Sequence, residues 1–246
     1  MSIDTARLPS RSSVRGTATW LLWMNLYLAA WAWGMAIVVV TGALVVINQV
    51  GEVNNSVMAF ARQGAIWFPF SVLIAITAAY LPVHIAAGLT RRSLALGSLL
   101  AAGGLALVYG VVFALLLVVE RAVFDAFGWQ WRIVEGLSPD SADVATLFVS
   151  STLLFLVAYV SGLLVGMSYQ RLGGWWGTLA LPLTAGPILL VSALLAQDAG
   201  PFSTSVWFGG DQPLLVGSAV TLLIAGLMAV AFDRLTRGAS VPNRTS

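Results

Sequence analysis

The stretch VATLFVSSTLLFLVAYVSGLLVGM spans Val144–Met167 and contains no acidic or basic residue. About 20 predominantly apolar residues carry an α-helix across the hydrocarbon core of a bilayer. A charged side chain at the centre of such a helix costs about 2.5–3.5 kcal/mol. This stretch therefore predicts a transmembrane helix, and it decides the fold class.

Five more stretches have the same character, since each is apolar and free of Asp, Glu, Lys and Arg. The six are Trp20–Ile47, Ile66–Leu89, Leu94–Val119, Val144–Met167, Trp175–Ala196 and Pro213–Phe232. Only 9% of the 246 residues are charged, whereas a soluble domain carries roughly 25%. The chain cannot supply the charged exterior of a soluble fold. We therefore predict an all-α membrane protein with six transmembrane helices.

The distribution of arginine predicts the orientation. Six crossings place both termini on one side of the membrane. Of the 12 basic residues, all arginines, only Arg62, Arg121 and Arg132 fall on the other side. The rest lie on the side of the termini: Arg7, Arg11, Arg15, Arg91, Arg92, Arg171, Arg234, Arg237 and Arg244. Because positive residues concentrate in cytoplasmic segments, both termini are predicted to be cytoplasmic, in the cell (plasma) membrane.

These boundaries divide the chain into three parts. Residues 1–16 form a cytoplasmic N-terminal segment, residues 17–236 one six-helix transmembrane domain, and residues 237–246 a disordered cytoplasmic tail. The first apolar run is too long for the core of a secretory signal peptide, so the first helix is expected to stay. The longest outer link, Glu120–Asp143, predicts a short amphipathic helix of its own. Its apolar residues are Val123, Phe124, Phe127 and Trp131.

Missing residue types exclude many chemistries. The chain has no Cys, no Lys and a single His, His84. Without Lys there is no phosphate-loop lysine for ATP hydrolysis, and without Cys there is no thiolate nucleophile or iron–sulfur cluster. One His cannot form a two-histidine metal site. We therefore expect no catalytic residue, no metal site and no cofactor in this chain, and we do not predict an enzyme.

Apart from tyrosines, His84 is the only ionisable residue within the six apolar runs, and it lies close to Pro82 in the second run. Such residues inside a membrane are the usual indication of function. Two interpretations remain open. Either His84 is hydrogen-bonded to a neighbouring helix at a proline kink, or it contacts a substrate or proton path.

Glycines and prolines predict where the helices meet or bend. Gly162 and Gly166 form a G-x-x-x-G pattern, which is typical of close helix contact. This contact is either packing within the chain or an interface between subunits. Pro182 and Pro187, with Gly186 between them, predict a kink in the fifth run. That kink either hinges the bundle along a substrate path or only shapes it.

The link Thr90-Arg91-Arg92-Ser93 joins the second and third runs as a tight cytoplasmic turn. Two adjacent arginines after a helix complement its negative pole. They either fix the topology alone or dock onto the carboxylates of a soluble partner. No carboxylate lies in any of the six runs, which disfavours proton- or sodium-coupled transport. Energy for uphill transport would then come from a partner chain.

With these residues the chain resembles the six-helix, export-type permease subunits of bacterial ABC transporters, common in Gram-positive bacteria and especially in actinobacteria. The resemblance rests on the arginine-bearing N-terminal stretch before a long first helix and on the turn Ala87–Ser93, AGLTRRS. The topology agrees over nearly the whole chain, and the motif over this turn alone. In one departure, Asp198–Gln212 lacks a clear pair of re-entrant apolar helices.

The resemblance implies that Thr90, Arg91, Arg92 and Ser93 contact an ATPase subunit that carries ATP and Mg. It also implies a second permease copy or a homologous permease, surrounding membrane lipid, and no nucleic acid. The expected function is the permease of an ATP-driven transporter that exports a hydrophobic or amphipathic substrate. A non-transporting scaffold or regulatory subunit is the main alternative. A third, an intramembrane enzyme acting on lipid, would need an acid paired with His84.

Overall fold

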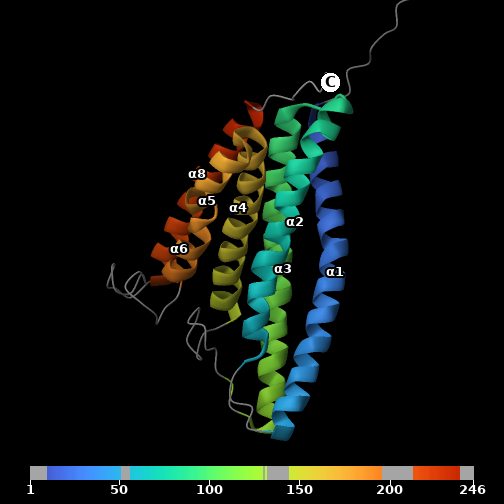
Figure 1. Ribbon diagram of the computed structural model, residues 1–246. Coiled ribbons are helices and arrows are strands. Elements are labelled where there is room, and N and C mark those ends of the chain that lie inside the picture. Colours follow the sequence, from blue (N-terminus) through green and yellow to red (C-terminus); the bar gives the residue numbers. More distant parts are fainter. Residues whose placement is uncertain (1–9, 51–55, 130, 132–143, 196–212, 239–246) are drawn as a thin grey trace, which may run out of the picture.

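The computed structural model describes residues 10–50, 56–129, 131, 144–195 and 213–238, and every structural statement below concerns these residues. They form an all-helical bundle (Figure 1). Its elements are α1 (Ser10–Val50), α2 (Met58–Ala86), α3 (Arg91–Phe127), α4 (Val144–Leu179), α5 (Leu181–Thr184), α6 (Gly186–Leu195) and α8 (Pro213–Arg237). Five of them, α1, α2, α3, α4 and α8, are long and apolar enough to cross a membrane. The predicted all-α fold is confirmed.

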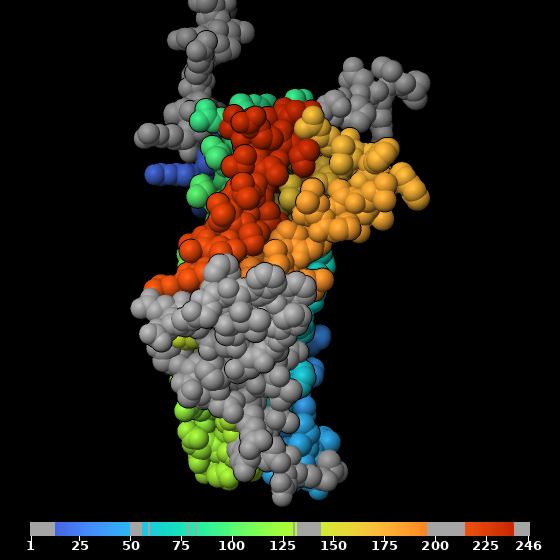
Figure 2. All heavy atoms as spheres, turned by 90° about the vertical axis from the view of Figure 1, so that its left-hand side faces the viewer, coloured from blue at the N-terminus to red at the C-terminus, as the bar shows by residue number. Residues whose placement is uncertain are grey.

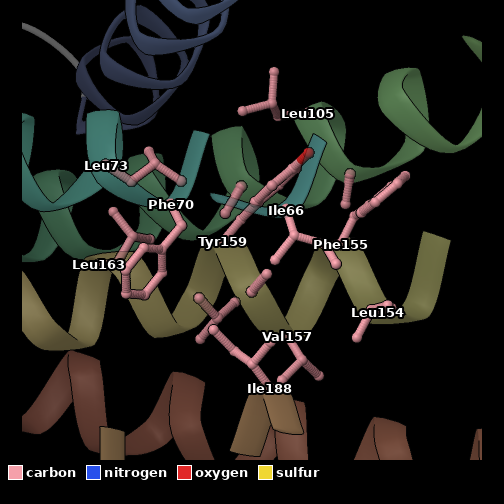
Figure 3. Packing of buried hydrophobic residues seen from close by; sticks show 14 of the residues in the cluster. Ile66, Phe70, Leu73, Leu105, Leu154, Phe155, Val157, Tyr159, Leu163 and Ile188 are labelled. Atoms are coloured by element: carbon pink, nitrogen blue, oxygen red, sulfur yellow. The ribbon is translucent and has the colours of Figure 1, made fainter. Parts of the chain in front are cut away.

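Helix α4 forms the centre of the bundle and is mostly buried. It lies between α2 and α3 on one side and α6 and α8 on the other (Figure 3). Tyr159 and Phe155 extend toward α2 and α3, and Val157 faces Ile188 of α6. The apolar stretch Val144–Met167 thus belongs to the helix against which α2, α3, α5, α6 and α8 pack.

The glycine pair of α4 faces α2 of the same chain. A Cβ atom at Gly162 would lie 2.6 Å from the carbonyl oxygen of Phe70, and one at Gly166 would lie 2.7 Å from that of Ile74. These separations are shorter than van der Waals contact, so only glycine lets the two backbones approach this closely. The G-x-x-x-G pattern thus sets the spacing of α2 and α4.

Helix α1 lies on the outside of the bundle, mainly against α3 (Figure 1). Its outward side chains are large and apolar, and Trp31 and Met35 are each 71% exposed. Such a face suits the apolar core of a bilayer. The helix begins at Ser10, earlier than the apolar run predicted. It tolerates Thr17 there because the Oγ1 of Thr17 donates to the Ser13 carbonyl, 2.9 Å away.

The predicted fifth crossing, Trp175–Ala196, is not one continuous helix. Turns at Ala180 and Ala185 interrupt it and leave the short helices α5 and α6. Pro182 and Pro187 stand in the two short helices, where each removes a backbone donor. The chain turns over inside α4 at Gly173, whose φ of 80° and ψ of 178° are not helical, and runs back through residues 174–179, α5 and α6 beside α8 (Figures 1 and 2). Leu181–Leu195 is shorter than the other five, and the whole returning segment, residues 174–195, is about 33 Å long at 1.5 Å per residue.

The prediction of a separate amphipathic helix in the outer link is wrong for three of its four residues. Val123, Phe124 and Phe127 do not belong to a separate helix, because α3 continues without interruption to Phe127. Gly128, with φ 69°, then ends α3 in the left-handed region that suits glycine. Trp131 follows the helix, and residues 132–143 lie outside the described part of the chain. Helix α3 would be about 55 Å long at 1.5 Å per residue, longer than the hydrocarbon core.

Candidate functional site

The turn between α2 and α3 is built by two local signals. Gly88 takes φ 75°, and its amide donates to the Ile85 carbonyl over 2.9 Å. Thr90 then caps α3, since its Oγ1 accepts the Ser93 amide at 3.1 Å. A glycine after one helix and a threonine before the next produce a short, defined connection. The predicted turn residues Thr90, Arg91, Arg92 and Ser93 therefore comprise a cap and the first turn of α3.

His84 connects the end of α2 to this turn. The side chain is buried, and its Nε2 lies 3.0 Å from the hydroxyl of Ser93. That hydroxyl donates its one proton to the Thr90 carbonyl, 2.7 Å away. It must therefore accept from His84, so Nε2 carries the imidazole proton. The hydrogen bond to a neighbouring helix, one of the two interpretations of His84, is present with Ser93 as the partner.

An aromatic ladder extends this connection to α1. Trp20 of α1 stacks on Tyr80 of α2 with ring centroids 4.5 Å apart, and Tyr80 lies 5.6 Å from the His84 ring. Stacked and tilted aromatic pairs contribute roughly 0.5–1.5 kcal/mol beyond their buried area. The turn is thus linked by contacts to both α1 and α2.

The two arginines of the turn have different surroundings. Arg91 reaches across to α8, where its Nη1 donates to the Arg237 carbonyl over 3.3 Å. Arg171 of α4 does the same to the Leu235 carbonyl, also at 3.3 Å. Both cations thus satisfy carbonyls at the negative pole of α8. Arg237 itself pairs with Asp233 at 2.9 Å.

Arg92 instead lines a surface groove beside Arg15 of α1. The groove has a volume of about 480 Å³ and no acidic residue in its lining. The lining consists of Val14, Arg15, Thr90, Arg92, Ser93, Leu96 and Leu100. We call it the Arg15–Arg92 groove, and we call this end of the bundle the arginine-rich end. The arginines of that end whose side chains the structure describes are Arg15, Arg91, Arg92, Arg171, Arg234 and Arg237.

The expected role of the arginine pair at a negative helix pole needs correction. Helix α2 ends at Ala86, and Arg91 and Arg92 are the first two residues of α3. They stand at the positive pole of α3, where acidic side chains are favoured and cations are not. Only Arg91 finds a negative pole, and it belongs to α8. Arg92 therefore stands where the positive potential of the α3 pole adds to that of Arg15.

A buried carboxylate, Glu120 of α3, occupies the opposite end of the bundle. Its Oε1 accepts the amides of Val57 and Met58 at 2.9 and 2.8 Å, and its Oε2 accepts the Ser56 hydroxyl and, at 3.1 Å, the Trp131 indole. The carboxylate therefore caps the start of α2 and meets its positive pole. Glu120 was predicted to belong to the outer link Glu120–Asp143, and no local sequence pattern indicated this Glu120 cap. Arg62, predicted to lie on the same side of the membrane as Arg121, is likewise buried, in α2.

The structure does not gather the four residues proposed for a substrate path or kink. Pro82 lies within α2, which continues in helical conformation to Ala86 and carries His84. Pro182 and Pro187 lie on α5 and α6, which pack against α4 on its far side from α2 (Figure 1). Two different places result, the α2–α3 turn and the break after α4. In the described ranges, no three His, Asp or Glu side chains cluster as a metal site would require.

Comparisons of the chain with protein families, with curated proteins and with solved structures find no match.

Proposed function

We propose that this chain is the membrane-spanning permease subunit of an ATP-driven, ABC-type transporter, with residues 17–236 as its transmembrane permease domain. A separate ATPase chain docks at the arginine-rich end and supplies the energy. The cargo is a hydrophobic or amphipathic molecule that is exported. One observation carries the proposal: the Thr90–Ser93 turn is bonded to α2 through His84 and to α8 through Arg91.

This arrangement suits the transfer of force from a soluble partner. A partner that displaces the turn would move the end of α2, because the His84–Ser93 bond is buried and short. It would also move the end of α8 through the Arg91 guanidinium. Packed helices joined by hydrogen bonds move as units rather than deforming continuously. The two helices lie on opposite sides of α4, so such a displacement would act across the bundle.

The hydrogen bonds of the Glu120 carboxylate support a separate source of energy for transport. A carboxylate that couples transport to protons or sodium must release its partners when the ion binds. Both oxygens of Glu120 are held by backbone and side-chain donors at the start of α2. Releasing them would uncap α2. We therefore assign Glu120 a structural role and place the motor in a partner chain.

The proposed topology has six crossings, with both termini cytoplasmic and the protein in the plasma membrane. Thr17 of α1 lies against Gly97 of α3, and Arg91 of α3 contacts Arg237 of α8. The start of α1 and the end of α8 thus lie at one end, which supports an even number of passes. The segment through α5 and α6 would supply the sixth. The excess of arginine at that end favours the cytoplasm.

The proposed assembly contains two permeases and two ATPases. The second permease is another copy of this chain or a homologous chain. Purification of the tagged protein from native membranes in mild detergent tests the proposal directly. We expect an ATPase chain with a phosphate-loop lysine to co-purify. Repeated recovery of the chain without any ATPase would contradict the proposal.

A non-transporting scaffold or regulatory subunit is the alternative, and the packing at the centre of the bundle favours it. Phe155 and Tyr159 stack with centroids 6.1 Å apart, and Tyr109 meets Tyr159 edge-on at 5.6 Å. These rings fill the space between α3 and α4. Reconstitution with the co-purified ATPase separates the two functions. Nucleotide-dependent movement of an amphiphile supports the permease, and binding of the ATPase without such movement supports the scaffold.

A further inference from the structure

The Arg15–Arg92 groove forms near a close approach of α1 and α3. A Cβ atom at Gly97 would lie 2.8 Å from Cβ of Thr17 and 3.1 Å from the Val14 carbonyl oxygen. This glycine brings the first turns of α1 up against α3. Arg15 then stands across from Arg92, and both side chains are exposed.

The end of the groove next to Arg15 and Arg92 attracts anions. Two guanidinium groups and the positive pole of α3 meet there, and neither the first turn of α3 nor the lining contains an acidic residue. Guanidinium forks bind phosphate oxygens in pairs, which a single ammonium group cannot do. An anion between Arg15 and Arg92 would relieve the repulsion that these charges otherwise experience.

The end of the groove next to Leu96 and Leu100 is apolar. Leu96 and Leu100 follow Arg92 on the same face of α3, about 6 and 12 Å further along the helix. Leu100 is 59% exposed, and the stripe continues along the exposed side chains of Leu107 and Val111. A free phosphate or nucleotide would leave this stripe unused. A molecule with a phosphate at one end and an acyl chain at the other matches both parts.

We propose that the Arg15–Arg92 groove binds an anionic phospholipid from the leaflet at the arginine-rich end. Arg15 and Arg92 hold its phosphate, and one acyl chain lies along Leu96 and Leu100. The site is independent of the proposed transport function, because it needs only the bundle and the bilayer. Its position beside the Thr90–Ser93 turn makes the bound lipid part of the surface that any soluble partner meets.

Native mass spectrometry of the full chain in mild detergent tests the proposal. Phosphatidylglycerol is titrated against phosphatidylcholine, which carries no net charge, and against glycerol phosphate, which has no acyl chain. We expect phosphatidylglycerol to be retained most strongly. Each arginine near an anionic lipid surface contributes about fivefold in affinity, so Arg15→Gln with Arg92→Gln should weaken phosphatidylglycerol binding roughly twenty-five-fold.

Matched variants decide between the groove and the general charge of this end. Arg234→Gln with Arg237→Gln removes the same charge at the same end but outside the groove lining. An equal loss in this control overturns the proposal. Glycerol phosphate binding as tight as phosphatidylglycerol overturns it too, because the apolar stripe then contributes nothing. Leu100→Asn should weaken the lipid and leave glycerol phosphate unchanged.

A conservative variant keeps the test valid if the double variant does not fold. Arg92→Lys retains the charge and loses the fork that pairs with phosphate. We expect a loss of roughly threefold for phosphatidylglycerol, with an unchanged elution volume in size-exclusion chromatography. Unchanged retention of this lipid by folded Arg92→Lys and by folded Arg15→Gln would overturn the proposal.

Discussion

The Nε2 atom of His84 lies 3.0 Å from the hydroxyl oxygen of Ser93, and this contact joins the last turn of α2 to the first turn of α3. A histidine inside an apolar helix is costly unless it is bonded. Here the bond goes to a residue of the turn that follows. The single histidine of the chain therefore belongs to the same structural unit as the two arginines of the turn.

Removal of the His84–Ser93 contact should loosen the turn by a small, measurable amount. In membrane proteins such side-chain bonds contribute roughly 0.6–1.7 kcal/mol. We expect a double-mutant cycle of His84→Ala and Ser93→Ala to give a coupling energy of about 1 kcal/mol in thermal unfolding. Thr77→Val is the control, because the Thr77 hydroxyl is bonded only within its own helix, to the Leu73 carbonyl. A coupling energy near zero would show that the two side chains act separately.

Truncation of Glu120 should uncap α2. Glu120→Ala leaves the Val57 and Met58 amides without their acceptor, and the loss should be about 3 kcal/mol because these donors then lack a hydrogen-bond partner to a charged group. Asp125→Ala is the matched control, since Asp125 is an exposed acid one turn further along α3. Chemical unfolding measures both, and hydrogen exchange at Met58–Ala61 should rise only in the Glu120 variant. Equal stabilities of the two variants would contradict the Glu120 cap.

Addition of a methyl group at Gly162 should separate α2 from α4. Its Cβ would lie 2.6 Å from the Phe70 carbonyl, so Gly162→Ala should destabilise the bundle by roughly 1–3 kcal/mol. Gly226→Ala on α8 meets open space, and it should be neutral or stabilising by up to about 1 kcal/mol. Unfolding in a detergent titration compares the two. A Gly162 variant as stable as the Gly226 variant would mean that α2 and α4 are further apart than described.

Reversal of charge in the turn tests the contact with the ATPase. Arg91→Glu with Arg92→Glu should lower ATPase association at least tenfold while membrane insertion stays intact. Arg121→Glu, at the opposite end of α3, is the control and should leave association unchanged. Co-purification and stimulated ATP turnover provide the measurements. Turnover that does not change in the double variant would remove the turn from the proposed function.

The orientation and the number of crossings can be tested with single cysteines, because the chain has none of its own. Gly16→Cys and Arg234→Cys lie at the arginine-rich end, and Ala126→Cys lies near the far end of α3. We expect a membrane-impermeant maleimide to label only Ala126→Cys in intact cells. Labelling of Gly16→Cys and Arg234→Cys from opposite sides would mean an odd number of passes.

The sequence was sufficient to predict the long helices, because an uncharged run of membrane-spanning length has few alternatives. It also contained the local signals for the break at Pro182, Gly186 and Pro187. The division of Trp175–Ala196 by turns could not be predicted from the sequence, since prolines are tolerated in many membrane helices. The positions of α5 and α6 depend on their packing against α4 and α8.

The candidate site was less accessible to sequence reasoning for two physical reasons. Glu120 meets Ser56 across 64 residues, so no local pattern relates them. The arginine pair was placed at the end of α2, because composition does not locate helix boundaries to within a turn. Once α3 begins at Arg91, the sign of the nearby helix pole reverses, and the role of Arg92 changes with it.

The central position of α4 has a consequence for biogenesis. The Tyr159 hydroxyl donates to the Ala65 carbonyl across 94 residues, and Gly162 faces Phe70. During synthesis, α2 enters the bilayer before α4, its main neighbour, has been translated. Until α4 is inserted, lipids or an insertase have to cover the face of α2 that later packs against Gly162. Nascent chains that stall before Tyr159 would therefore remain exposed to membrane quality control.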